Sequence, residues 1–361
     1  MSSNEDTARP RRALLLLWII VTAAGLAGWL IAFTISDAAR VWRALLVNFL
    51  FFTSLSAGLL MLSPTIVLAR GNWAGRLEGM TLAGLAFALP SVLVLAALWA
   101  GGPTWVPWVG NPDVGWKAWL TWPSVFARDM GTLIIFWLVA SIYVHQRRDR
   151  RPTKLAAWLV FAYIVVFSLL GFDLVLSLAL KWTSALFGWY FLITAMYIAA
   201  CAWALAAAWK GAEKERLHDV AKLVYVFSLI TTYFMFCQLL TIWYENLPDE
   251  ASYLVPRMNF GPWRWVSIAL IVVVYLGPLV VLMPVWAKQT RWWLGAVAAV
   301  LLAGLWVQTW WLVEPTFYPH ELPFGLAEGA GIVFLGGVLA AAFTLYAPAL
   351  PRELPQESHV L

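Results

Sequence analysis

Long apolar runs recur along the whole chain, and short polar segments separate them. A helix needs about 20 mainly apolar residues to cross the hydrocarbon core of a bilayer. Ten runs reach this length, so the pattern predicts an all-α integral membrane protein with ten transmembrane helices. The predicted spans are residues 13–33, 41–69, 77–98, 124–144, 155–179, 183–209, 221–245, 263–286, 292–313 and 325–346.

The basic residues between these spans are divided unequally between the two sides of the membrane. Seventeen of the 24 Lys and Arg residues fall on the side of the N-terminus, and the other seven fall on the opposite side. Because cytoplasmic loops carry the excess of Lys and Arg, both termini are predicted to be cytoplasmic. A missed or additional span would scramble this alternation, so the charge distribution also supports the count of ten.

Composition agrees with a membrane protein and leaves no room for a large soluble domain. Apolar residues make up 62% of the 361 residues and charged residues 12%, whereas soluble domains carry about 25% charged residues. We expect one membrane domain at 13–347 between cytoplasmic tails at 1–12 and 348–361. Its second to fifth spans (41–179) and its sixth to ninth spans (183–313) both start outside, which favours two related four-helix bundles.

Few residues of the chain could hold a redox cofactor. The four histidines are His145, His218, His320 and His359, and none lies in the middle of a span, so a bis-histidine haem site in the bilayer is excluded. The sequence has no cysteine cluster, no Walker motif and no dinucleotide-binding fingerprint. We therefore predict no covalently bound cofactor and no metal site, and nothing points to a nucleic-acid partner.

Ionisable side chains inside spans are costly and suggest function. Arg128 and Asp129 lie near the outer end of the fourth span, Asp173 near that of the fifth and Asn48 near that of the second, so all four share the outer third of the membrane. One arrangement pairs Arg128 with Asp173 and leaves Asp129 facing a cavity. The group is interpreted either as a structural ion pair or as a quinone-headgroup site or proton path. Snorkelling of the charges to the interface is a further alternative.

A second polar set lies in the later spans. Tyr190, Gln238 and Gln308 are predicted near the same outer depth, and Tyr197, Tyr233 and Tyr275 nearer the middle of the membrane. Each tyrosine is also compatible with core packing around one satisfied hydroxyl. At the outer end of the seventh span, Tyr244 and Glu245 begin a run of polar residues that either stops the helix before Pro248 or draws protons outward. Trp182 and Trp263 are expected to anchor span ends in the headgroup layer.

Two stretches resemble one family of membrane subunits. The first runs from His218-Asp219 through Gln238 and Ile242-Trp243-Tyr244-x-Asn246-Leu247-Pro248-Asp249-Glu250 to Arg257 and Trp263. The second is Phe172-Asp173-x3-Ser177-Leu178 followed by Trp182-x-Ser184-x-x-Phe187-Gly188-x-Tyr190. Both are similar to the ActF-type (NrfD-like) membrane subunit of alternative complex III. The chain differs from the family pattern at 179–181, where Glu-Pro-His is usual, and at Glu245, where a small residue is usual.

The resemblance implies a ten-helix fold with two four-helix bundles and one peripheral helix at each end. It implies an electron-transport role in a respiratory chain, as a quinone-binding or proton-translocating subunit of a quinol:cytochrome c oxidoreductase in the bacterial inner membrane. The implied partners are a multihaem cytochrome c, an iron–sulfur molybdopterin-like subunit, an NrfD-like paralogue, quinol and membrane lipids. By position, the resemblance carries over Asp173, Gln238, Tyr244, Asn246, Asp249, Glu250 and Arg257.

Two other functions stay open at this point. One is an NrfD-type membrane anchor of a polysulfide-reductase-like complex. The other is a proton-coupled secondary transporter, but transporters place their binding groups near the bilayer midplane, whereas the charges here are predicted near the outer face.

Overall fold

The computed structural model of the protein describes residues 2–71, 73–111, 119–149, 154–259 and 261–346. The described chain is helical throughout and has no strand. Ten of its helical segments are long and apolar enough to cross a membrane, in agreement with the ten predicted spans. The chain is therefore a multi-pass membrane protein.

The helices follow one another in a simple order. The first six α-helices are α1 (Ser2–Ile35), α2 (Ala38–Leu68), α3 (Glu78–Thr81), α4 (Ala88–Trp105), α5 (Trp122–Arg148) and α6 (Leu155–Leu174). The others are α7 (Phe187–Trp209), α8 (Lys214–Glu245), α9 (Pro248–Met258), α10 (Gly261–Leu270), α11 (Gly277–Val281), α12 (Val285–Gln289), α13 (Arg291–Val313) and α14 (Leu326–Tyr346). Short helices of other types are η1 (Gly75–Leu77), η2 (Leu82–Phe87), η3 (Leu176–Leu178), the π-helix η4 (Ile271–Leu276) and η5 (Glu314–Thr316).

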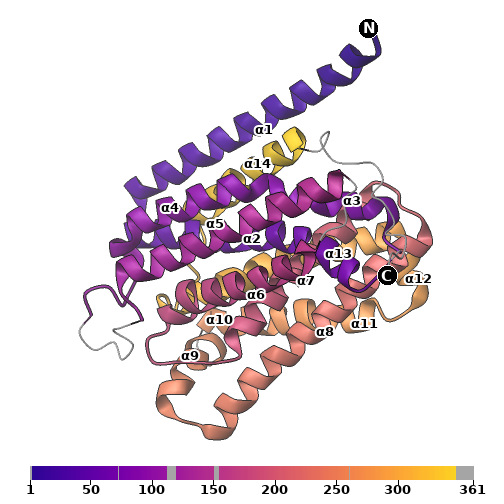
Figure 1. Cartoon of the computed structure of the whole chain (residues 1–361). Helices are drawn as coiled ribbons and strands as arrows, with labels where there is room; N and C mark the ends of the chain where they lie inside the picture. Colours follow the sequence, from indigo (N-terminus) through magenta and orange to yellow (C-terminus); the bar gives the residue numbers. More distant parts are fainter. Residues whose placement is uncertain (1, 72, 112–118, 150–153, 260, 347–361) are drawn as a thin grey trace.

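Helix α2 lies in the centre of the array (Figure 1). It contacts α4, α6, α7, α13 and α14, and nearly all of its residues from Val41 to Ile66 are buried. A helix that is apolar on every side fits such a position, because each of its faces meets another helix instead of lipid. We call the end of the array at which α2 begins the outer end, after the side predicted from the basic residues.

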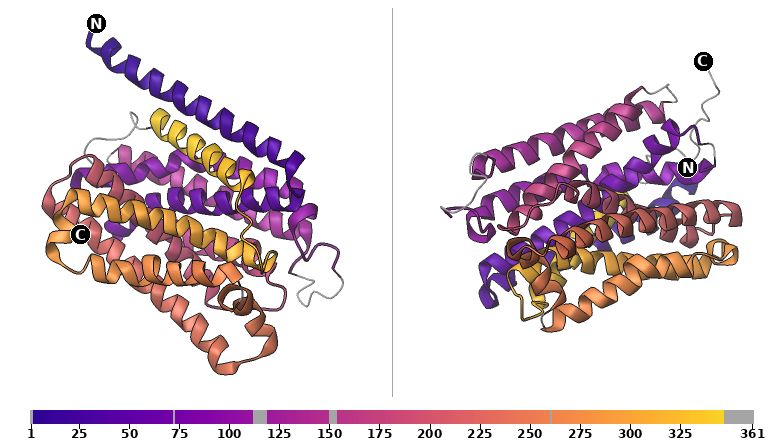
Figure 2. Two further views of the ribbon diagram at one scale, coloured as in Figure 1. Left: turned by 180° about the vertical axis from the view of Figure 1, so that it is seen from behind. Right: turned by 90° about the horizontal axis from the view of Figure 1, so that it is seen from below.

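The remaining helices pack around α2 in a regular way. Helices α4, α5 and α6 pack in sequence beside it, while α7 packs on α8 and α13, and η4 lies between α8 and α13. The first and last helices, α1 and α14, run side by side at the edge of the array (Figure 2). At their inner ends, the Arg11 side chain donates hydrogen bonds to the carbonyls of Thr344 and Leu345.

Several helix ends differ from the prediction. Helix α1 begins at Ser2, so the segment predicted as an N-terminal tail continues the first helix. Helix α4 continues to Trp105, beyond the predicted end at residue 98, and the segment after the seventh span forms the separate helix α9. Trp182 and Trp263 were expected in the headgroup layer but are buried. The predicted C-terminal tail lies outside the described residues.

Close contact between α2 and α7 depends on Gly58. A Cβ atom at this position would lie 2.5 Å from the carbonyl oxygen of Ala195 and 2.9 Å from Cβ of Ala199. Gly58→Ala should therefore lower the free energy of unfolding by about 1–3 kcal/mol, since backbone atoms would have to move apart. The control is Gly131→Ala in α5, where nothing lies within 4 Å of the added Cβ and where alanine favours the helix. Thermal unfolding in detergent should shift in opposite directions for the two variants; equal shifts would contradict the tight contact.

Candidate functional site

The polar group at the outer ends of α5 and α6 contains an ion pair between Arg128 and Asp173. Nε and Nη2 of Arg128 donate to Oδ2 of Asp173 at 2.8 and 2.6 Å. The indole Nε1 of Trp119 donates to Oδ1 at 3.1 Å, and the ring centroid of Trp119 lies 3.8 Å from Cζ of Arg128. The buried Asp173 carboxylate thus has donors on both oxygens, and the pairing suggested by the sequence is present.

Asp129, the next residue on α5 after Arg128, lacks the hydrogen-bond donors that surround Asp173. Its side chain is completely buried, and neither carboxyl oxygen accepts a hydrogen bond from the described part of the chain. Its charged neighbours are Asp173 and Arg128. A carboxyl group donates a hydrogen bond only when it carries a proton, so Asp129 can bond to the Asp173 carboxylate only in a protonated pair. Two carboxyl groups beside one guanidinium form a place where one proton can be held.

Asn48 is also at the outer end but has other partners. Its Nδ2 donates to the carbonyl of Ala44 at 2.8 Å, and its Oδ1 accepts a hydrogen bond from Trp306 Nε1 at 3.0 Å. Its amide also packs against Gly331 of α14. Asn48 therefore joins α2 to α13 and α14, and its observed hydrogen bonds do not extend to the Arg128–Asp173 pair.

Two further ion pairs at the outer end were missed by the sequence analysis. Nε and Nη2 of Arg40 donate to the two carboxylate oxygens of Glu328, each at 2.9 Å. Nε of Arg43 lies 3.6 Å from Glu314, too far for a hydrogen bond, and both oxygens of the buried Glu314 have no donor among the described residues. These pairs fix the start of α2 to the end of α13 and the start of α14.

At the inner end, a third buried carboxylate was also missed. Oε1 of Glu78 accepts hydrogen bonds from Arg147 Nη2 at 2.7 Å and from Ser63 Oγ at 2.8 Å. The Ser63 hydroxyl in turn lies 2.9 Å from the Tyr143 hydroxyl. This network joins α2, α3 and α5 at the end of the array opposite to Asp129.

Tyr190, Tyr275 and Gln308 of the second polar set form a chain of hydrogen bonds through α7, η4 and α13. The hydroxyls of Tyr190 and Tyr275 lie 2.8 Å apart, and Nε2 of Gln308 donates to the Tyr190 hydroxyl at 2.6 Å. Tyr275 belongs to the π-helix η4, and the Tyr197 hydroxyl donates to the carbonyl of Val274 in the same segment. A π-helical turn widens the backbone ladder and leaves carbonyls for such partners. The sequence identified these residues but not the π-helix that joins them.

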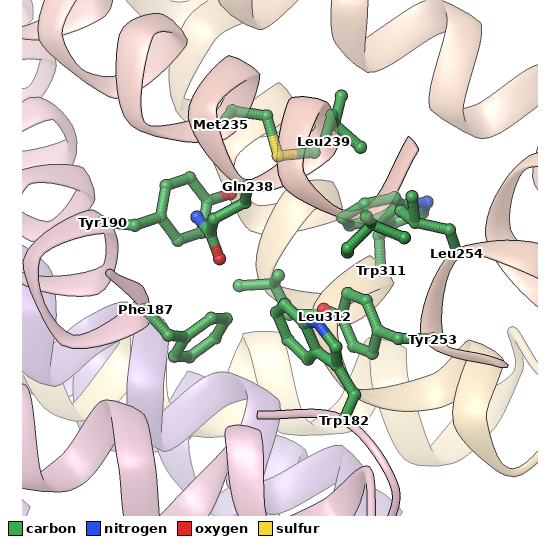
Figure 3. Close-up of a pocket in the computed structure, with 11 residues that line it drawn as sticks. Trp182, Phe187, Tyr190, Met235, Gln238, Leu239, Tyr253, Leu254, Trp311 and Leu312 are labelled. Carbon is green, nitrogen blue, oxygen red and sulfur yellow. The ribbon is translucent and has the colours of Figure 1, made fainter. Parts of the chain in front are cut away.

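Beside this chain lies an apolar pocket between α7, α8, α9 and α13 (Figure 3). The room inside it is about 10 Å³, enough for roughly one water molecule. Tyr190 and Gln238, both predicted as candidates, line it, together with aromatic rings from the segment before α7 and from α7, α9 and α13. The other lining residues are Trp182, Phe187, Met235, Leu239, Ile242, Tyr253, Leu254, Trp311 and Leu312.

Arg257 of α9 lies next to two residues that line the pocket, Tyr253 and Trp311. It is completely buried and donates to the carbonyls of Tyr253, Trp311 and Leu312 and to the Thr316 hydroxyl. Burial lowers the pKa of the guanidinium, while Tyr253 and Tyr190 raise it. Because two of its acceptors are the last carbonyls of α13, the cation also lies at the negative end of that helix dipole.

Other candidates from the seventh span lie outside the lining of the pocket. Tyr244 and Glu245 are exposed, as is Tyr233. Asn246 caps α8 in the left-handed conformation, with φ of 49°, and its backbone N–H bonds to Ile242. Asp249 and Glu250 occupy the first turn of α9, and loss of solvation and the neighbouring Glu245 raise the pKa of Glu250. This acidic run therefore lies at the end of α8 and the start of α9.

No family model matches the chain, and no curated protein matches it. Within the described residues, no group of three or more His, Cys, Asp and Glu side chains could hold a metal ion.

Proposed function

We propose that the chain is an integral membrane subunit of a quinol:electron-acceptor oxidoreductase of the alternative complex III type. In this role it takes up protons released by quinol, and partner subunits take up the electrons. The proposed partners are a multihaem cytochrome c, an iron–sulfur molybdopterin-like subunit and an NrfD-like paralogue, and the proposed location is the bacterial inner membrane with both termini in the cytoplasm.

The arrangement of the helices supports this proposal. Helices α2, α4, α5 and α6 pack around one another, as do α7, α8, the segment from α10 to α11, and α13. The paired α1 and α14 lie outside both groups. This is the packing expected of two four-helix bundles with a peripheral helix at each end of the chain.

The residues that carry the family resemblance are close neighbours in the second bundle. Trp182 stacks on Tyr253 with ring centroids 3.8 Å apart. The Cζ atom of Arg257 lies 3.7 Å from the centroid of the same Tyr253 ring. Gln238 lines the same pocket. The two stretches therefore describe one local structure, which supports the resemblance beyond a chance match of separate motifs.

The single observation that carries the proposal is the buried Asp129 beside the Arg128–Asp173 pair. Oxidation of a quinol releases protons, and a base within reach accelerates that step. Asp173 is occupied by three donor contacts, whereas Asp129 has none. Asp129 is thus the carboxyl group available to take a proton, and Arg128 compensates the negative charge that remains after the proton leaves.

Purification of the tagged chain from its native membrane tests this proposal. We expect it to carry haem c and iron–sulfur subunits with it at fixed stoichiometry, measured by haem absorbance, iron content and mass spectrometry. Recovery of a lone protein that retains an activity, such as proton-coupled uptake of a solute into proteoliposomes, would overturn the proposal in favour of a transporter.

A further inference from the structure

The inner end of the second bundle gathers basic side chains from two neighbouring helices. Helix α12 packs on α8 (Figure 1). Lys288 of α12 and Lys222 of α8 lie within electrostatic reach of each other, and His218, one turn before Lys222, lies within reach of both. Because two neighbouring ammonium groups repel each other, this arrangement favours an anion beside them.

The protein supplies only part of the negative charge that these lysines need. Nζ of Lys222 lies 2.9 Å from Oδ1 of Asp219. The ammonium of Lys288 donates instead to the carbonyls of Leu282 and Met283, each at 2.8 Å, and has no carboxylate partner among the described residues. Loss of solvation lowers the pKa of Lys288, and the charge of Lys222 lowers it further. An ammonium group has three protons to donate, so Lys288 keeps one for a ligand.

Exposed apolar side chains continue from the two lysines along the outside of the helix array. On α8, Lys222 is followed on the same helix face by Val226 and Leu229, which are both exposed. Helix α11, which also packs on α8, leads to Lys288 and exposes Val280 and Met283. A molecule with an anionic head and apolar chains therefore finds matching surfaces side by side.

Exposed tryptophans indicate that this end lies at the level of the lipid headgroups. Trp286, two residues before Lys288, is exposed, and its ring centroid lies 5.6 Å from that of Trp293. Trp292 is exposed as well, with Cζ of Arg291 4.6 Å from its ring centroid. Tryptophan is enriched at membrane–water interfaces, where its amphipathic ring sits among the headgroups. The lysines are therefore placed at the depth of lipid phosphates.

We propose that an anionic phospholipid binds at this inner end, with its phosphate on Lys222 and Lys288 and its acyl chains along the exposed residues of α8 and α11. His218 provides a third basic group near the phosphate. Basic pockets between transmembrane helices are known to bind anionic lipid headgroups. The site selects a headgroup with a net negative charge, because a zwitterionic headgroup brings its own cation to the two lysines. It lies at the opposite end of the array from Asp129 and does not depend on the proposed function.

Native mass spectrometry of the full-length chain in detergent, with any subunits that accompany it, tests the proposal. The probes are dioleoylphosphatidylglycerol and dioleoylphosphatidylcholine, which share their acyl chains and differ in the headgroup. We expect the wild type to bind phosphatidylglycerol about tenfold more tightly than phosphatidylcholine. Lys222→Gln and Lys288→Gln should each lower the affinity for phosphatidylglycerol about fivefold, the attraction typical of one lysine, and leave that for phosphatidylcholine unchanged.

Control variants separate lipid binding from a structural role of the lysines. Lys214→Gln removes an exposed lysine from the first turn of the same helix and should keep the wild-type ratio of the two affinities. Lys288→Arg keeps the positive charge and should keep the ratio as well. If Lys222→Gln and Lys288→Gln weaken both lipids equally or neither of them, or if the wild type does not distinguish the lipids, the proposed site is overturned.

Thermal unfolding in detergent distinguishes a lipid from a free anion. A ligand that binds only the folded protein raises the unfolding temperature, so phosphatidylglycerol should raise it more in the wild type than in Lys222→Gln. Sodium phosphate should give the same unfolding temperature as sodium chloride at equal ionic strength, because it lacks the acyl chains. If phosphate alone raises the unfolding temperature in the wild type but not in Lys222→Gln, the site takes a free anion and the lipid proposal is overturned.

Discussion

Replacing Asp129 with asparagine should lower the rate of quinol oxidation by the complex about a hundredfold while the complex remains assembled. Loss of a general base costs roughly 10²–10⁴ in rate. The fold should tolerate the change, because the buried carboxyl oxygens accept no hydrogen bond among the described residues and asparagine has nearly the same shape. Stopped-flow oxidation of decylhydroquinone, with proton release followed by a pH-sensitive dye, measures the effect.

A matched control makes the same substitution where no function is expected. Asp219→Asn changes a partly exposed carboxylate at the inner end of α8 that pairs with Lys222 at 2.9 Å. Exposed pairs of this kind contribute about 0–1 kcal/mol, so the rate and the unfolding temperature should both stay near the wild-type values. Wild-type turnover and proton release by Asp129→Asn would reduce the Arg128–Asp129–Asp173 group to a structural element and remove the main support for the proposed function.

The sequence predicted the ten spans because apolar length is a strong signal, but it located helix ends less well. Helix α4 continues through Gly101 and Gly102, beyond the span end predicted at residue 98. A Cβ at Gly101 would collide with the ring of Trp42, and one at Gly102 with the ring of Trp122. These glycines are helical because they make room for two tryptophans, which is a tertiary reason that no local pattern reveals.

The candidate site likewise contains one contact that could be predicted from the sequence and others that could not. Arg128 and Asp173 could be paired from the sequence because they lie at equal depth on consecutive helices. Arg40 and Glu328 could not, since 288 residues separate them and both lie at span ends, where charges are ordinary. Tyr253 was missed because the segment after Pro248 was interpreted as a stop, whereas it folds as α9 and turns its aromatic face toward the bundle.

The second large effect is expected for Arg257→Met, which should lower the free energy of unfolding by about 3 kcal/mol. The guanidinium donates to four oxygens, and hydrogen bonds to charged groups contribute about 1.5–3 kcal/mol each, although not additively. Methionine fills the space but removes the donors to the carbonyls of Trp311 and Leu312 and to the Thr316 hydroxyl. It also removes the positive charge from the end of α13.

Thermal unfolding in detergent, followed by circular dichroism, distinguishes this role from a general effect of losing an arginine. Arg264→Met, at an exposed position on α10, is the matched control and should unfold at the wild-type temperature. Arg257→Lys should fall between the wild type and Arg257→Met, because an ammonium group restores the charge but cannot reach all the acceptors that the planar guanidinium holds. If Arg257→Met and Arg264→Met unfold at the same temperature, water satisfies these carbonyls as well as the guanidinium does. In that case Arg257 is not needed to hold α9 against the end of α13.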